Sequence, residues 1–191
     1  MINETDYINN PLTKEQENQI DSLFAQYDNQ NTPGCSVGVI RDGRFIYKKS
    51  FGMADLENDI PITVNSKFEI GSVSKQFTAT GIALLAIEEQ LDLDDDVRKY
   101  IPELPDYGKS ITIRHLLHHT SGIRDYVQLF LFSDSINQFE NHLNNDSLEI
   151  ILKQKELNFP PGKKHLYSNS GYLLLREIIE IVSGMSHQKF I

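Results

Sequence analysis

The sequence has one cysteine, no block of basic residues and no long apolar run, and each of these shortages excludes a class of protein. The single cysteine, Cys35, leaves no internal disulfide and no cysteine-rich zinc site. The formal net charge is −9 and lysines cluster only in pairs, so we do not expect nucleic acid as a partner. No apolar stretch approaches the roughly 18 residues that span a bilayer, so we expect no membrane span.

The N-terminal sequence "MINETDYINN" is polar and acidic. It lacks the basic and apolar regions of a signal peptide, so as written the protein is interpreted as cytoplasmic, unless a leader precedes it. Residues 1–12 are predicted to be a flexible tail. Residues 13–191 are predicted to form one domain that is truncated at its C-terminal end, since the chain stops within "GMSHQKFI".

Two strand-like runs surround Asp42 and Gly43 in "CSVGVIRDGRFIYKKSFG". Asp-Gly favours a two-residue turn, so this segment predicts a β-hairpin. Nothing after residue 52 has a strand-like pattern. Because an isolated hairpin is only marginally stable in water, we expect the sequence to be the N-terminal part of a longer protein whose strands complete an antiparallel sheet.

Helical patterns account for most of the remaining chain. Thr13 and Gln16 have the spacing of a capping box, and Thr112 is a candidate N-cap of a short helix that Gly122 would end. Longer helices are predicted at about residues 72–90, 147–156 and 171–183. The fold class is therefore α+β, with a mostly helical part and one N-terminal β-hairpin.

Ser72 and Lys75 in "GSVSK" are candidates for a nucleophile and its base. They lie three residues apart, which places them on one face of a helix, whereas Ser74 is adjacent to Lys75 and faces elsewhere. A serine hydroxyl needs a base within hydrogen-bond reach, and burial beside an apolar helix disfavours the charged form of a lysine. Backbone N–H groups at the start of this helix would also face a developing oxyanion.

The same spacing has an ordinary structural explanation. Serine is a preferred N-cap, and lysine is a common surface residue. Ser186 and Lys189 repeat the spacing without a comparable apolar helix behind them. The spacing by itself therefore leaves both interpretations open.

A second motif, "HLYSNSGYLLL", places Tyr167, Ser168 and Asn169 in a turn directly before a helix. A tyrosine and an amide that a turn brings to a Ser-Lys pair supply a second proton carrier and an orienting group. Together with "FEIGSVSKQFTA", "LDLDDDVRKYIPEL" and "HHTSGI", this motif resembles the serine β-lactamase and penicillin-binding-protein superfamily. The resemblance is to its branch of class C β-lactamase-related serine hydrolases and extends from about Thr13 to the end of the chain.

The resemblance implies a β-lactamase/transpeptidase-like fold and a hydrolase that works through a covalent acyl-enzyme without a cofactor. It implies that Ser72 is the acylated nucleophile and that Lys75 is its partner in proton transfer. Tyr167 corresponds to the general base or acid, and Asn169 to the asparagine that hydrogen-bonds the lysine and the substrate amide. The implied substrates are β-lactams, D-Ala-type peptides or small esters and amides.

A third motif of the superfamily does not occur between Ser170 and Ile191. This motif, Lys or His, then Thr or Ser, then Gly, lies on a strand that lines the pocket and supplies an oxyanion-hole amide. The "HTSG" at 119–122 resembles the family's structural loop instead. Because loss of one such donor costs about 10²–10³ in rate, we expect little turnover by the 191-residue chain. The alternative is a non-catalytic fragment or binding module of the same fold.

Two patterns resemble metal sites, but neither is complete. The histidines of "HLLHH" could hold zinc, but a zincin has glutamate directly after the first histidine, where this chain has Leu116. The acidic segment "DLDDDVRKYIPE" resembles a calcium loop, but Val97 replaces the required glycine and Pro102 interrupts the loop. We interpret these as helix-face or capping histidines and a solvated acidic turn, and we expect no metal.

Overall fold

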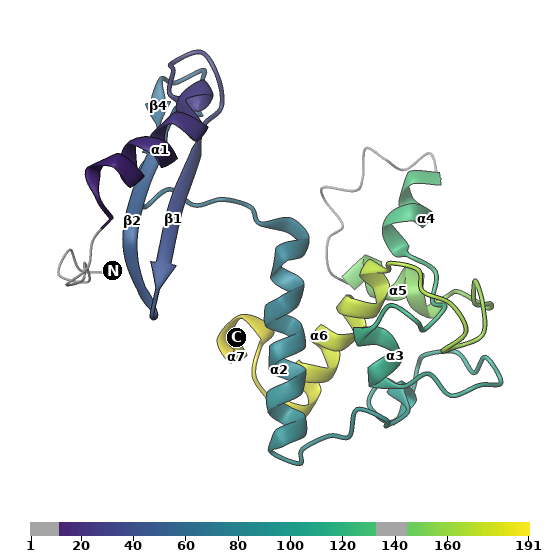
Figure 1. The fold of residues 1–191 in the computed structure, drawn as a ribbon. Coiled ribbons are helices and arrows are strands. Elements are labelled where there is room, and N and C mark those ends of the chain that lie inside the picture. The colour runs from purple at the N-terminus through teal and green to yellow at the C-terminus, as the bar shows by residue number, and fades with distance from the viewer. Residues whose placement is uncertain (1–11, 133–144) are drawn as a thin grey trace. The chain divides into compact units, whose positions relative to one another are not determined.

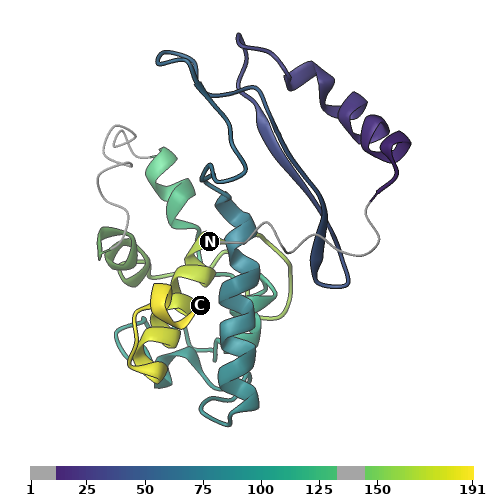
Figure 2. The same ribbon diagram turned by 90° about the vertical axis from the view of Figure 1, so that its left-hand side faces the viewer.

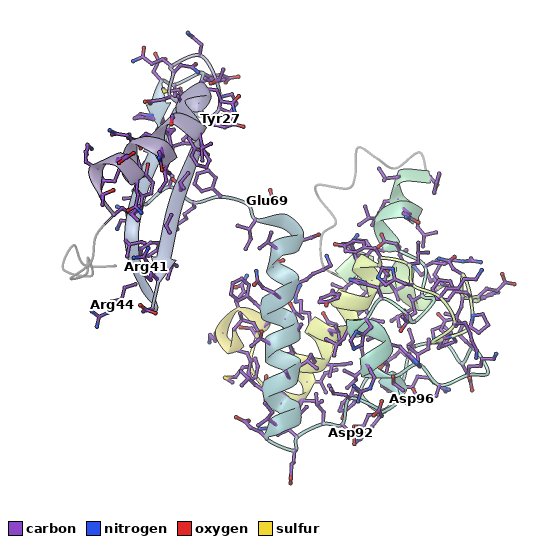
Figure 3. All side chains as sticks on the ribbon, in the orientation of Figure 1. Tyr27, Arg41, Arg44, Glu69, Asp92 and Asp96 are labelled. Carbon is purple, nitrogen blue, oxygen red and sulfur yellow. The ribbon has the colours of Figure 1, made fainter. Side chains whose placement is uncertain are left out.

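The computed structural model describes residues 12–132 and 145–191 (Figure 1). The chain divides into two compact units, one up to Glu69, which is labelled in Figure 3, and one from Ile70 to Ile191. The predicted flexible tail lies almost wholly outside the described residues. The single domain over residues 13–191 stays a prediction.

The predicted hairpin is confirmed in the first unit. Strands β1 (Cys35–Arg41) and β2 (Arg44–Phe51) pair antiparallel, and the turn between them lies between the labelled arginines in Figure 3. The turn residues Asp42 and Gly43 have φ angles of 49° and 76°. A tight hairpin turn needs positive φ at both positions, which aspartate tolerates and glycine adopts without strain.

A helix precedes the hairpin, as its capping residues predict. Helix α1 (Lys14–Phe24) begins at Thr13, and the side chains of Thr13 and Gln16 each accept a hydrogen bond from the other's backbone N–H. This reciprocal capping box satisfies two N–H groups that the first helical turn cannot pair. The helix continues into a short 3-10 turn, η2 (Ala25–Tyr27).

Helix α1 is held to strand β2 by one ring contact and one polar cluster. The rings of Phe24 and Phe51 stack with their centroids 5.7 Å apart. Asp21 accepts a hydrogen bond from the Tyr47 hydroxyl at 2.5 Å, and it forms an ion pair with Lys49 at 2.9 Å. A helix that packs on the hairpin supplies cover that two strands alone lack.

A second small sheet follows the hairpin. Strands β3 (Met53–Asp55) and β4 (Ile60–Pro61) pair antiparallel, so the prediction that nothing after residue 52 forms a strand was wrong. These strands have three and two residues, which is too short for an alternating pattern to be visible in the sequence. Proline in β4 also argues against a strand on propensity alone.

The second unit is helical in its described residues and is built around α2 and α6, which lie side by side in Figures 1 and 2. In chain order its helices are the 3-10 turn η3 (Gly71–Ser74), α2 (Lys75–Ile87), the 3-10 turn η4 (Val97–Lys99), α3 (Ile113–Leu117), α4 (Tyr126–Phe132), α5 (Asn145–Leu152), α6 (Asn169–Ser183) and α7 (His187–Phe190).

The core of this unit lies where α2 and α6 meet. Ile82 and Leu85 of α2 and Leu174 and Ile178 of α6 are buried. Gly81 permits the close approach, because a Cβ at this position would lie 3.1 Å from the side chain of Ile179 on α6. The two motifs of the sequence lie at the N-terminal ends of these two helices, so the packing of α2 on α6 positions the candidate site.

One predicted helix end was wrong. Helix α3 begins at the Thr112 cap as expected, but it ends at Leu117 rather than near Gly122. The chain turns at His119, which has a positive φ of 55°, because hydrogen bonds to the loop before α6 fix this segment. Across the described part of the chain, no helix has the length and apolar character needed to cross a membrane.

Candidate active site

Ser72 and Lys75 are brought together at the start of α2. Ser72 lies in η3, and Lys75 is the first residue of α2, so its Nζ donates to Ser72 Oγ at 3.2 Å. Ser74 faces the backbone instead, where its Oγ donates to the carbonyl of Gly71 at 2.7 Å. The structure thus separates the two serines in the way that their spacing from Lys75 suggests.

The segment before α6 brings the second motif to the same place. Ser168 is the N-cap of α6, and its Oγ accepts from the backbone N–H of Gly171 at 3.4 Å. On either side of this cap, the Tyr167 hydroxyl lies 2.5 Å from Ser72 Oγ, and Asn169 Oδ1 accepts from Lys75 Nζ at 2.8 Å. The structure therefore brings all four predicted site residues into one hydrogen-bonded cluster.

The charge on Lys75 lies close to two tyrosine rings. Its Nζ is 4.9 Å from the ring centroid of Tyr167 and 5.5 Å from that of Tyr172. Partial burial pushes the pKa of the Tyr167 phenol upward, but the Lys75 ammonium and the Ser72 hydroxyl outweigh burial, so the pKa lies below its ordinary value of 10.0. A phenol in this setting loses its proton more readily than a free tyrosine.

His119 contacts the cluster, a role that the sequence did not reveal. Its ring centroid lies 4.6 Å from that of Tyr167 and 5.1 Å from that of Tyr172. Its Nδ1 accepts the backbone N–H of Ser168 at 3.2 Å, so the ring packs in its neutral form. Burial first, and then the charges of His165 and Lys75, hold the pKa of His119 below its ordinary value.

Asp125 is a second residue that sequence reasoning missed. Its carboxylate is buried and accepts hydrogen bonds from both the backbone N–H and the side-chain amide of Asn169. The sequence signal that could have found it is an aspartate directly before the apolar run "YVQLFLF", which is the position of a helix N-cap. That signal predicts the cap on α4 but not the contact with Asn169.

The residues that resembled metal sites have other partners in this structure. His115 Nδ1 accepts the backbone N–H of Thr112 at 3.1 Å as part of the cap of α3. In the acidic segment after α2, where Asp92 and Asp96 are labelled in Figure 3, Asp94 accepts a hydrogen bond from Arg114 at 2.8 Å. Within residues 12–132 and 145–191, no group of three His, Cys, Asp or Glu side chains could hold a metal ion.

The fold and this cluster define a class of protein. The sequence profile of the beta-lactamase family matches residues 20–191, and the chain belongs to that family. Penicillin-binding protein 4* of Bacillus subtilis (strain 168) is 35% identical over 181 residues, which are 94% of this chain and 39% of that relative. The chain thus spans well under two thirds of its relative's length.

Two solved structures are similar in fold. The crystal structure of FmtA from Staphylococcus aureus has a TM-score of 0.75 at 27% identity, over 93% of this chain and 46% of that one. A class C beta-lactamase mutant has a TM-score of 0.72 at 28% identity, over 96% of this chain and 48% of that one. The predicted family and the β-lactamase/transpeptidase-like fold are confirmed.

Proposed function

We propose that Ser72 is the nucleophile of a serine hydrolase that forms an acyl-enzyme. The observation that carries this proposal is the position of Ser72 Oγ, which lies 2.5 Å from the Tyr167 hydroxyl and 3.2 Å from Lys75 Nζ. A proton carrier, Tyr167, and a cation, Lys75, thus lie within hydrogen-bond distance of one serine. A serine nucleophile needs such a proton carrier within reach.

In the acylation step, Tyr167 acts as the phenolate, the form that its lowered pKa makes more accessible. Ser72 Oγ attacks the carbonyl carbon of the substrate and transfers its proton to the phenolate oxygen of Tyr167. A tetrahedral oxyanion forms near the start of α2, where helix N–H groups and the positive dipole end favour negative charge. The bond to the leaving nitrogen or oxygen then breaks, and Tyr167 returns the proton to that leaving atom. Lys75 keeps a positive charge beside the phenol oxygen throughout.

In the deacylation step, the same groups act on water. Tyr167 takes a proton from a water molecule, which attacks the ester carbon on Ser72. The tetrahedral intermediate collapses, Ser72 Oγ leaves and regains the proton, and the product is a free carboxylic acid. Asn169 Oδ1 holds Lys75 Nζ at 2.8 Å, so the charged amine stays beside both oxygens during the cycle.

The substrate class that we propose is a β-lactam, a D-Ala-type peptide or a small ester or amide. The names of the similar proteins support it, since one is a penicillin-binding protein and another a class C beta-lactamase. For the 191-residue chain we expect slow acylation and little steady-state turnover, because both steps pass through a tetrahedral oxyanion. The third motif, which would supply an oxyanion donor, is not among its residues.

Mass spectrometry of the intact protein tests the proposal. The chain is incubated with benzylpenicillin, with a small activated ester and with a fluorophosphonate, and the modified residue is mapped by peptide sequencing. We expect one adduct per chain, on Ser72, and no adduct in Ser72→Ala.

The matched controls are Ser74→Ala and Ser186→Ala. Ser74 lies two residues from Ser72 but bonds to the Gly71 carbonyl, and Ser186 begins the second S-x-x-K sequence. Both variants should label as the wild type does. An adduct on Ser74 or Ser186 would sink the assignment of Ser72.

A non-catalytic binding module of the same fold is the second candidate function. The absence of the third motif from residues 170–191 favours it. A binding module would retain benzylpenicillin without a covalent adduct, and Ser72→Ala would bind it as the wild type does. Intact mass and equilibrium binding, measured on the same two proteins, separate the two functions.

A further inference from the structure

Asp125 is surrounded by hydrogen-bond donors from two helices. The residue is 5% exposed and lies directly before α4. Its Oδ1 accepts the backbone N–H groups of Val127 at 2.8 Å and Gln128 at 3.3 Å. Its Oδ2 accepts the backbone N–H of Asn169 and, at 3.1 Å, the Asn169 side-chain Nδ2. All four of these groups are hydrogen-bond donors, and a carboxylate only accepts, so an aspartate suits this position.

The contact with Asn169 decides which way round its amide lies. An asparagine side chain has one end that accepts and one end that donates. With Nδ2 on the Asp125 carboxylate, Oδ1 faces Lys75 and accepts from its Nζ at 2.8 Å. Turned by half a rotation, the amide would place its oxygen against a carboxylate and its NH₂ group against an ammonium. Both hydrogen bonds would then be lost.

The carboxylate is itself fixed on both sides. The neighbouring backbone is bound by Ser170, whose Oγ accepts from Tyr126 N–H at 2.8 Å and donates to the Arg124 carbonyl at 2.7 Å. Asp125 thus joins the first turn of α4 to the first turn of α6. Because the Asp125 carboxylate is buried in this network, it has little freedom to move if the Asn169 side-chain amide changes position.

From this geometry we propose that Asp125 is a positioning residue, which sets the orientation of Asn169 and through it the place of Lys75 beside Ser72. This inference rests on the proposed function, because Lys75 matters here as a partner of the nucleophile. The chain of contacts runs from Asp125 to Asn169 Nδ2, from Asn169 Oδ1 to Lys75 Nζ, and from Nζ to Ser72 Oγ at 3.2 Å. Asp125 acts without touching substrate.

The first test is the variant Asp125→Ser, measured as the rate of Ser72 labelling by a fluorophosphonate. Serine is as good an N-cap as aspartate, so it keeps the cap on α4, but its shorter side chain withdraws the acceptor from Asn169. We expect the maximal labelling rate to fall by about tenfold, which is the value of one hydrogen bond to a charged group, with the apparent affinity for the probe nearly unchanged.

The matched control is Ser170→Ala, which removes two buried hydrogen bonds from the same segment without touching the side chain of Asn169. We expect it to lower the thermal midpoint at least as much as Asp125→Ser does, but to slow labelling far less. If the two variants slow labelling in proportion to their loss of stability, Asp125 has only a structural role and the proposal is overturned.

The second test exchanges the two partners. Asn169→Asp keeps an acceptor for Lys75 but sets two carboxylates face to face, so we expect labelling to slow. Adding Asp125→Asn restores a donor opposite the new carboxylate, so the double variant should label faster than Asn169→Asp alone, although Asp125→Asn by itself slows the wild type. Additive losses in the double variant would contradict the proposal.

Proton exchange of the Asn169 side-chain amide gives a reading that needs no reactivity at Ser72. Its NMR signal in the full chain is assigned by its loss in Asn169→Asp. We expect slow exchange in the wild type and at least tenfold faster exchange in Asp125→Ser; equal rates would overturn the role of Asp125. An unlabelled Ser72 together with this change would refute the proposed function, but the orientation of Asn169 by Asp125 would still hold.

Discussion

Two tyrosines, one in each unit of the chain, make equally short hydrogen bonds, but the pKa values of their phenols shift in opposite directions. The hydroxyls of Tyr47 and Tyr167 both lie 2.5 Å from an oxygen. The partner of Tyr47 is the Asp21 carboxylate, and burial together with that negative charge raises the pKa of the Tyr47 phenol. The partner of Tyr167 is a hydroxyl beside the Lys75 ammonium, and the pKa of Tyr167 is lowered despite partial burial.

The difference teaches that the charge beside a phenol, rather than the length of its hydrogen bond, decides what it can do. Tyr47 keeps its proton at any ordinary pH and serves as a fixed donor between strand β2 and helix α1. Tyr167, with its lowered pKa and its hydroxyl 2.5 Å from Ser72 Oγ, is the phenol that we propose exchanges a proton with Ser72. One tyrosine joins β2 to α1 in the first unit, and the other is our proposed proton carrier in the second.

Removing each hydroxyl in turn gives the largest expected effect. Tyr167→Phe should slow acylation of Ser72 by about 10²–10⁴-fold, because it removes the group that takes the proton of the nucleophile. Tyr47→Phe should leave the rate unchanged. The rate of adduct formation, followed by intact mass, measures both. A loss under threefold in Tyr167→Phe would contradict the proposed mechanism, in which Tyr167 and not Lys75 takes the proton.

Two glycines, one in each unit, allow a comparison of how tightly their turns are packed. Gly43 and Gly122 share a φ of +76°, but a Cβ at Gly43 meets open space, whereas one at Gly122 would lie 2.1 Å from the Phe159 carbonyl oxygen. We expect Gly43→Ala to cost about 1 kcal/mol of unfolding free energy through backbone strain alone. Gly122→Ala should cost about 3 kcal/mol or more, because backbone must also move.

Chemical denaturation, followed by circular dichroism, measures both glycine variants. Because Gly122 belongs to the second unit, its variant should also slow labelling of Ser72, whereas Gly43→Ala should not. Equal costs for the two substitutions would show that the loop at Phe159 yields without strain.

Removing the Tyr47 hydroxyl should have a smaller effect on stability than Gly122→Ala. Tyr47→Phe removes the hydrogen bond to Asp21 and should lower the free energy of unfolding by about 1 kcal/mol. Thermal unfolding of the two proteins measures the change, with Tyr27→Phe as a control at an exposed position. A variant as stable as the wild type would indicate that the ion pair between Asp21 and Lys49 holds α1 without the phenol.

Acid should destabilise the second unit in a defined window. Burial is the largest cause that lowers the pKa values of His115, His119 and His187 from 6.5 in the folded chain. The unfolded chain therefore binds more protons than the folded chain. The contribution of these histidines to stability is fully present above pH 6.5 and is lost as the pH falls below that value. The carboxylates with lowered pKa values, such as Asp95 at about 2, lose their contribution only below about pH 4.

Denaturation midpoints at about pH 8 and about pH 5 test this window. His187, whose Nε2 lies 3.0 Å from the Thr78 hydroxyl, offers a matched variant. His187→Gln keeps a polar group at the site but no longer titrates, so its midpoint should fall less than that of the wild type between the two pH values. An identical decline would assign the acid sensitivity to other groups.

The sequence predicted those parts of the fold and of the site that depend on neighbours in the chain. The Asp42-Gly43 turn, the cap at Thr13 and the pairing of Ser72 with Lys75 each rest on residues within a few positions of one another. Such patterns are visible in one dimension. The approach of the "YSN" motif to Ser72 was implied by the family resemblance, since no local rule connects the two segments.

The features that the sequence did not predict depend on tertiary packing. Strands β3 and β4 are too short to show a period. The contact of Asp125 with Asn169 joins residues far apart in the chain, and the local pattern around Asp125 indicates only a helix cap. His119 turns out of α3 with a positive φ because the loop before α6 binds its backbone and ring, which a helical pattern does not reveal.

The central claim of the proposed mechanism is that the Lys75 ammonium lowers the pKa of the Tyr167 phenol, so that its phenolate can take the proton of Ser72. A titration of the chain labelled with ¹³C at the tyrosine Cζ atoms, assigned with Tyr167→Phe and Tyr47→Phe, tests it most directly. We predict that Tyr167 titrates below 10.0 and that Tyr47 titrates above it. A Tyr167 that titrates at or above Tyr47 would contradict the account.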